Sequence, residues 1–175
     1  SCLTEPFRFL GKDAYLQEIA AQVEIPVLRK DFTVDEYMIY QACLLGASAV
    51  LLICAILDDA QLRAYRELAE SLGMDALVEA HDETEACRAA ISGARIIGVN
   101  NRDLKTSQVD VTNSVRLRSL IPEEAAYVSE SGIRTTQDIR VLRENRVDAV
   151  LIGETLMRSP KKREALEELN GGMIL

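Results

Sequence analysis

Residues 94–105 have the sequence ARIIGVNNRDLK, which changes character in the middle. Ile96–Val99 form a short apolar run that predicts a buried strand. Five polar side chains follow at the exit of that strand, from Asn100 to Asp103 and at Lys105. In a parallel α/β sheet, ligand-binding groups collect at the carboxyl ends of the strands, so this cluster indicates a functional site. An ordinary solvated loop between a strand and a helix explains the segment equally well.

The same alternation of apolar runs and helix-period segments extends along the chain, at a spacing of roughly 20 to 25 residues, the size of a βα unit. Residues 48–54 form a near-continuous apolar run, typical of a strand buried on both faces of a parallel sheet. We predict one domain over residues 1–175, with strands at 2–3, 26–28, 48–54, 74–79, 96–99, 125–128 and 148–152. Helices are expected at 13–23, 33–45, 58–72, 82–91, 111–120, 135–145, 155–158 and 161–169, with Thr33 or Asp35, Asp58 and Thr135 as N-caps.

Right-handed crossovers in one direction allow an open doubly wound sheet or a (β/α)8 barrel. An open sheet places its site at a single switch point, whereas a barrel draws on all its strand exits. Polar residues follow nearly every predicted strand, and this favours the barrel. The fold class expected is therefore α/β, as an incomplete (β/α)8 barrel of about seven βα units.

Composition excludes several functional classes. The chain has 175 residues, of which 48% are hydrophobic, and carries a net charge of −8. This acidity argues against nucleic acid as a partner. No apolar run approaches the roughly 20 residues that span a bilayer, and the N-terminus lacks the pattern of a signal peptide, so we expect a cytoplasmic protein without a membrane partner. The cysteines and the single histidine do not have the spacing of metal ligands, so we expect no metal site. We interpret His81 as a loop residue. The four cysteines are interpreted as reduced core thiols, at Cys2, Cys43, Cys54 and Cys87.

Seven motifs together resemble indole-3-glycerol phosphate synthase, the ring-closing enzyme of tryptophan biosynthesis. They occur in the family's order over nearly the whole chain: LTEP (3–6), PVLRKDF (26–32), DEY (35–37), ALVE (76–79), GVNNRDL (98–104), SESGI (129–133) and GETLM (153–157). The resemblance implies a (β/α)8 barrel that converts 1-(2-carboxyphenylamino)-1-deoxyribulose 5-phosphate to indole-3-glycerol phosphate, with loss of carbon dioxide and water. It implies a small phosphorylated substrate and no cofactor.

The resemblance also assigns roles to individual residues. Lys30 matches the catalytic lysine, a general acid at a substrate oxygen, and Glu79 matches the carboxylate for acid and base work in the later dehydration. Asn100 and Glu130 match residues that orient or stabilise the substrate. The remaining matches are to substrate-binding or phosphate-binding positions, at Phe32, Arg102, Ser131, Gly132, Gly153 and Glu154.

The chemistry of these residues agrees with the implied roles. A lysine that faces a carboxylate in a desolvated barrel mouth can have its pKa tuned for proton donation, although a purely structural salt bridge is the alternative for Lys30 and Glu79. Gly132 and Gly153 would let backbone N–H groups approach a phosphate, or would simply serve turn geometry. Because a carboxylate repels phosphate, we expect the backbone N–H of Glu154 to contact the ligand and its side chain to point away.

Arg102 has two interpretations. It contacts the ligand, or it forms a bridge to Asp103 or to a neighbouring loop. The sequence does not distinguish the two.

The resemblance begins inside the family's second strand. A (β/α)8 barrel takes about 250 residues, and the family's first strand carries a Glu-x-Lys pair that has no counterpart here. The strands at Cys2 and Val150 would then be open edges, which predicts pairing with a second copy or with a separate N-terminal piece. A barrel that only binds a sugar phosphate is the main alternative function. Another phosphosugar barrel, related to phosphoribosylanthranilate isomerase, would use a Cys/Asp pair instead, and the KDF and NNR motifs argue against it.

Overall fold

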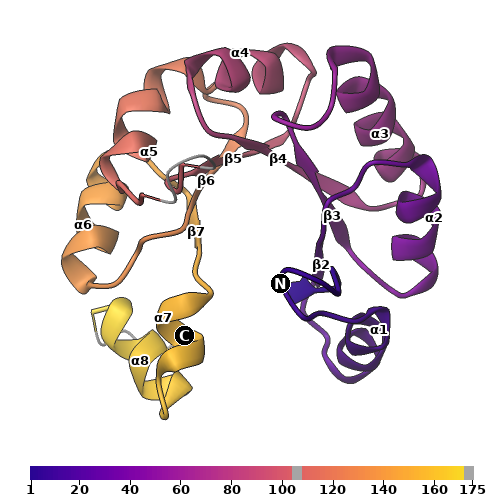
Figure 1. Ribbon diagram of the computed structural model, residues 1–175. Helices are drawn as coiled ribbons and strands as arrows, with labels where there is room; N and C mark the ends of the chain where they lie inside the picture. Colours follow the sequence, from indigo (N-terminus) through magenta and orange to yellow (C-terminus); the bar gives the residue numbers. More distant parts are fainter. Residues whose placement is uncertain (104–107, 172–175) are drawn as a thin grey trace. The chain divides into compact units, whose positions relative to one another are not determined.

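The structure, a computed structural model, describes residues 1–103 and 108–171 (Figure 1). The chain forms two compact units. The first contains Ser1–Glu79 and Arg88–Ile96, and the second contains Ala80–Cys87 and the chain from Ile97 onward. The prediction of a single domain is not tested by this division and stays a prediction.

The first unit is built from parallel strands with helices between them. Its strands are β1 (Cys2–Leu3), β2 (Leu28–Lys30), β3 (Ala49–Ile53) and β4 (Asp75–Ala80), and its helices are α1 (Asp13–Gln22), α2 (Glu36–Leu44), α3 (Asp59–Ser71) and the end of α4 (Glu83–Ile91). The β3 run is buried as its composition predicted, and it pairs with β4 in the register Ile53↔Glu79. Asp35 and Asp58 accept hydrogen bonds from the first turns of α2 and α3, which confirms both as caps.

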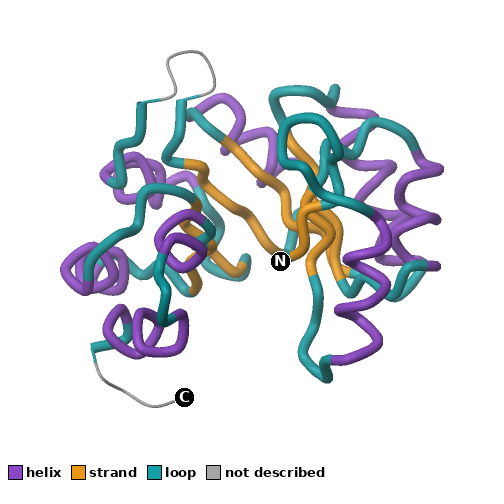
Figure 2. Tube along the Cα trace, turned by 60° about the horizontal axis from the view of Figure 1, so that its bottom comes forward, coloured by secondary structure: helices purple, strands orange, loops and turns teal. Residues whose placement is uncertain are grey.

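The second unit repeats the pattern. Its strands are β5 (Ile96–Asn100), β6 (Ala126–Glu130) and β7 (Ala149–Leu151), and its helices are α5 (Thr112–Leu117) with a 3-10 turn (Arg118–Leu120), α6 (Thr136–Glu144), α7 (Glu154–Arg158) and α8 (Lys162–Leu169). Thr135 and Asp138 form a capping box at α6. Figure 2 shows that the helices of each unit lie on one side of its strands.

The strand order is that of the sequence, β1-β2-β3-β4-β5-β6-β7. Every crossover therefore advances by one strand in the same direction. A doubly wound sheet would reverse its strand order at a switch point, which does not occur here. The fold is an incomplete (β/α)8 barrel, as predicted.

Two strands differ from their predicted bounds in a way that matters for the site. β2 was expected at 26–28 but runs over Leu28–Lys30, because Pro26 has no N–H for the ladder and Lys30 pairs with Leu3 of β1. β6 was expected to end at residue 128 but continues to Glu130, which pairs with Leu151. Lys30 and Glu130 are therefore strand residues rather than loop residues.

The cysteines are all free, but they are not all core residues. Cys2 and Cys54 are buried and Cys43 is partly buried, whereas Cys87 is exposed on α4, so its prediction as a core thiol was wrong. The spacing of apolar residues along α4 did not show whether Cys87 lies on the buried face of the helix or at the margin of that face. No helix in the described part of the chain is long and apolar enough to cross a membrane.

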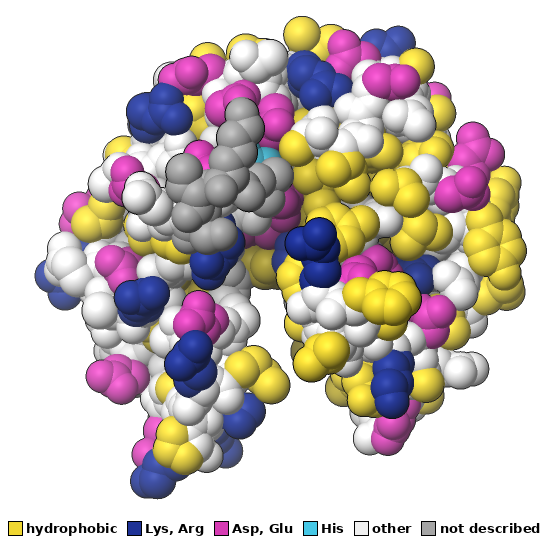
Figure 3. Space-filling model, in the orientation of Figure 1, with side chains coloured by type: hydrophobic (Ala, Val, Ile, Leu, Met, Phe, Trp, Pro, Cys, Tyr) yellow, Lys and Arg dark blue, Asp and Glu magenta, His cyan; other side chains and the backbone are white. Residues whose placement is uncertain are grey.

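Apolar side chains gather on the surface of the first unit (Figure 3). They come from the loop after β1, from the segment before β2 and from α2. Within these three segments, the most exposed are Phe7, Leu10, Ile25, Tyr37 and Leu44.

Candidate functional site

Lys30 and Glu79 form an ion pair at the carboxyl ends of β2 and β4. The Lys30 Nζ lies 3.1 Å from the Glu79 Oε2, and the two side chains are 19% and 3% exposed. The structure thus brings together the two residues that the sequence suggested as an acid–base pair, and their catalytic roles stay a prediction.

The residues on either side of Lys30 belong to a buried polar network. Side chains alternate along a strand, so Arg29 and Asp31 face away from Lys30. The Arg29 Nε donates a hydrogen bond to the Thr4 Oγ1 at 3.0 Å, and its Nη2 donates to Asp13 on α1 at 2.9 Å. The Thr4 hydroxyl in turn donates to Asp31. This network holds the end of β2 against β1 and α1.

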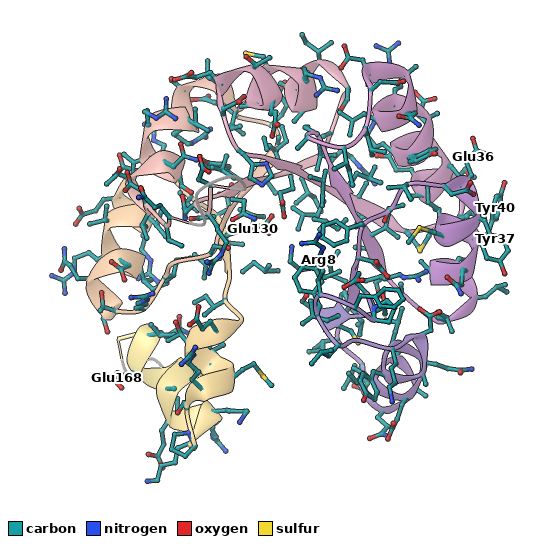
Figure 4. The ribbon with its side chains drawn as sticks, viewed as in Figure 1. Arg8, Glu36, Tyr37, Tyr40, Glu130 and Glu168 are labelled. Carbon is teal, nitrogen blue, oxygen red and sulfur yellow. The ribbon has the colours of Figure 1, made fainter. Side chains whose placement is uncertain are left out.

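Phe32 lies beside the loop that follows β1. Its ring stacks on that of Phe9, with the ring centroids 5.5 Å apart. The Glu5 carboxylate shapes this loop by accepting hydrogen bonds from the backbone N–H groups of Phe7, Arg8 and Phe9 (Arg8 is labelled in Figure 4). Burial raises the pKa of Glu5, but the three N–H groups and the charge of Arg8 lower it by more, so that it lies below its ordinary value of 4.5. An aromatic surface therefore stands at the exits of β1 and β2.

Asn100 and Glu130 end β5 and β6 in the second unit. The Asn100 Oδ1 accepts a hydrogen bond from the backbone N–H of Arg102 at 3.0 Å. The Glu130 side chain, labelled in Figure 4, is fully buried. Each is the last residue of its strand, and their roles toward a substrate stay predictions.

Ser131 and Gly132 follow β6 with an unusual backbone. Both have positive φ, 67° for Ser131 and 81° for Gly132. A Cβ on Gly132 would lie 2.2 Å from the Val109 Cγ1, so only glycine fits this position. The predicted phosphate contacts of this turn stay a prediction.

The second predicted phosphate loop, at Gly153 and Glu154, has an ordinary backbone, unlike the turn at Ser131 and Gly132. Gly153 has a φ of −104° and nothing within 4 Å of an added Cβ, so its backbone does not require glycine. The Glu154 carboxylate lies 3.6 Å from the Arg102 Nη2 and 3.0 Å from the Arg158 Nε. Arg102 therefore forms an ion pair with the first residue of α7, whereas the sequence analysis left open a ligand contact or a bridge to Asp103 or a neighbouring loop.

Sequence analysis missed two features of the second unit. His81 is more than a loop residue, because its Nδ1 lies 2.9 Å from the Glu85 carboxylate and its carbonyl accepts from Asn113 at 3.0 Å. A glutamate four residues after the histidine was the available signal. The other feature is a buried network around Asn101, described below.

Comparison with known proteins gives three results. The family model for indole-3-glycerol phosphate synthase matches residues 1–169. The "Indole-3-glycerol phosphate synthase" of Ruminiclostridium cellulolyticum is 58% identical over 171 residues, which is 98% of this chain and 66% of that protein. The protein of the same name from Lacticaseibacillus casei is 55% identical over 166 residues, which is 95% of this chain and 64% of that protein. The chain thus spans slightly less than two thirds of the length of these relatives.

Solved structures with low sequence identity share the fold. A crystal structure described as KGPDC from Streptococcus mutans has a TM-score of 0.74 at 11% identity, covering 97% of this chain and 82% of that one. A chain of the tryptophan synthase a2b2 complex from Pyrococcus furiosus has a TM-score of 0.69 at 12% identity, covering 94% and 75%.

Proposed function

The chain belongs to the indole-3-glycerol phosphate synthase family, and we propose that it carries the reaction of that family, the conversion of 1-(2-carboxyphenylamino)-1-deoxyribulose 5-phosphate to indole-3-glycerol phosphate. The observation that carries the proposal is the pair formed by Lys30 and Glu79 at 3.1 Å. Ring closure needs a proton at the carbonyl oxygen that is attacked, and the later dehydration needs a group that moves protons.

Lys30 supplies the first proton in this proposal. Its ammonium donates to the carbonyl oxygen as the new carbon–carbon bond forms, and the carboxyl group on the ring then leaves as carbon dioxide. The hydroxyl formed from that carbonyl departs as water. Glu79 holds Lys30 in place beforehand, and it accepts or donates a proton during dehydration.

The resemblance also suggests binding roles for residues of the second unit. The backbone at Ser131 and Gly132 holds the phosphate, with Gly153 and the N–H of Glu154 as further donors. Asn100 and Glu130 orient the substrate. The aromatic surface of Phe32 and Phe9, in the first unit, suits the ring of an anthranilate group.

A second candidate function is binding of a sugar phosphate without turnover. The specific observation that favours it is the turn after β6, where Ser131 and Gly132 both have positive φ and Gly132 leaves no room for a side chain. In this case the turn holds the phosphate, and Lys30 and Glu79 form only a structural salt bridge.

A homo-oligomer and a cytoplasmic location belong to the same proposal. β1 and β7 are the terminal strands of the sheet order, and exposed apolar side chains gather on the first unit. Edge strands pair readily with another chain. A second copy of the chain is the expected partner, and a monodisperse monomer in sedimentation would count against it.

The deciding experiment follows formation of indole-3-glycerol phosphate by its fluorescence, with the purified 175-residue chain. Lys30→Ala tests the mechanism, and Lys161→Ala, which alters an exposed lysine, is the matched control. Turnover lost in the first variant and kept in the second supports the synthase function. A folded chain that binds the phosphorylated product without turnover supports the second candidate.

A further inference from the structure

The Asn101 side chain has a hydrogen-bond partner for every donor and acceptor position. It is 3% exposed. Its Nδ2 donates to the Ser129 Oγ and to the Ser131 carbonyl, each at 3.0 Å. Its Oδ1 accepts from the Ser114 backbone N–H at 3.1 Å and from the Ser114 hydroxyl at 2.8 Å. A fully satisfied buried amide of this kind fixes the groups around it in one arrangement.

One of these bonds acts on the turn after β6. Ser131 has a φ of 67°, a conformation that a residue with a side chain keeps only where its surroundings impose it. The bond from Asn101 to the Ser131 carbonyl is such a constraint. Neighbouring contacts act elsewhere in the turn, because Val109 packs against Gly132 and the Thr155 hydroxyl donates to the Ile133 carbonyl at 2.7 Å.

Peptide geometry passes this constraint to the next N–H group. The carbonyl of Ser131 and the N–H of Gly132 belong to one planar trans peptide, in which they point in opposite directions. Holding the carbonyl toward Asn101 therefore aims the Gly132 N–H away from the buried network. We propose that Asn101 is a positioning residue, which aims the Gly132 N–H at a phosphate oxygen of the ligand. This inference rests on the proposed phosphate site at Ser131 and Gly132.

A purely structural role for Asn101 makes a different prediction. In that case any disruption of the buried network would weaken the fold and affect all ligands alike. Tyr127 offers the matched control, since its hydroxyl donates to the Ser114 carbonyl at 2.7 Å within the same network. Tyr127→Phe removes that bond without altering the group that bonds the Ser131 carbonyl.

The first measurement compares the affinity for indole-3-glycerol phosphate with that for indole-3-glycerol. The chain has no tryptophan, so the indole emission of either ligand reports its binding directly. The dissociation constant of indole-3-glycerol divided by that of indole-3-glycerol phosphate isolates the contribution of the phosphate, and this ratio is high when the phosphate binds well. We expect Asn101→Ala to lower this ratio at least about tenfold, or about 1.4 kcal/mol, and Tyr127→Phe to leave it within about twofold.

A second variant keeps the size of the side chain and adds no charge. Asn101→Leu removes the donor to the Ser131 carbonyl without placing a carboxylate that would itself repel phosphate. It should lower the ratio as Asn101→Ala does, so the test survives if one of the two variants fails to fold. A folded variant of either kind that keeps the wild-type ratio overturns the inference.

Backbone 15N relaxation without ligand separates this inference from the proposed function. The order parameter of Gly132 should fall from the rigid range near about 0.85 to below about 0.6 in the Asn101 variants, and stay high in Tyr127→Phe. If the wild-type chain shows no preference for the phosphorylated ligand, the proposed phosphate site is wrong. The relaxation data still decide whether Asn101 holds the turn, and an unchanged order parameter overturns that role.

Discussion

Breaking the pair of Lys30 and Glu79 should cost stability as well as activity. The perturbation is a cycle of Lys30→Met, Glu79→Gln and the double variant. Removing one partner of a fully buried ion pair costs about 3 to 5 kcal/mol, because a buried charge remains. Lys30 keeps 19% of its side chain exposed, so water replaces part of the lost interaction. We therefore expect about 2 to 3 kcal/mol for Lys30→Met.

Glu79→Gln should cost less, because the amide keeps the shape of the side chain and still accepts a hydrogen bond from Lys30. We expect about 1 kcal/mol for this change, the difference between a hydrogen bond to a charged acceptor and one to a neutral acceptor. In the double variant no buried charge is left over at this pair, so its loss should fall short of the sum by about 1 to 2 kcal/mol.

Urea unfolding measures all four proteins. With a slope of about 2 kcal/mol per molar urea, Lys30→Met should lower the midpoint by about 1 M. Additive losses, with a coupling below about 0.5 kcal/mol, would refute the view that Glu79 depends on Lys30. Synthase activity measured on the same samples shows whether the double variant regains stability without regaining turnover, as a catalytic role for the pair requires.

Three further predictions concern single positions. Gly132→Ala should cost at least about 2 kcal/mol in urea unfolding, because its φ is positive and Val109 occupies the space of the new Cβ. Gly73→Ala, with a similar φ and open space, should cost about 1 kcal/mol, and equal losses would contradict the packing argument. The pKa of Glu5 is lower in the folded protein than its ordinary value of 4.5, so Glu5 stabilises the fold above pH 4.5 and this contribution is lost as the pH falls through the folded pKa. In melting temperatures measured against pH, Glu5→Gln should therefore flatten the decline on the acid side. An unchanged slope would argue against this role of Glu5. Burial raises the pKa of Tyr127 to about 12, so stability should fall between pH 10 and 12, and Tyr127→Phe should weaken that fall in thermal melts at high pH.

Local sequence features predicted most of the secondary structure. Asp35, Asp58 and Thr135 cap their helices as expected, because a cap bonds to groups two or three residues away. The β3 run is buried because its composition leaves no polar face. Strand ends were less accurate, since a ladder continues as far as its neighbour pairs with it, as at Lys30 and Glu130.

The candidate site was predicted in part. Its members came from strand exits and motifs, and the structure brings Lys30 to Glu79 and Arg102 to Glu154. Their roles toward a ligand stay predictions. The supporting groups were not predicted, because Asn101 carries no periodic or motif signal that distinguishes it from the neighbouring Asn100.

The sequence by itself determined the order of strands and helices, the caps, the family resemblance and the polar strand exits, since all of these depend on residues close together in the chain. Only the tertiary structure decided which buried polar groups meet. Arg29 bonds to Thr4 across 25 residues, and Asn101 bonds to Ser129 across 28. These partners are set by strand register and by the direction in which each side chain leaves its strand. Neither the register nor the side-chain direction can be read from one segment of the sequence, because both depend on how distant segments pair.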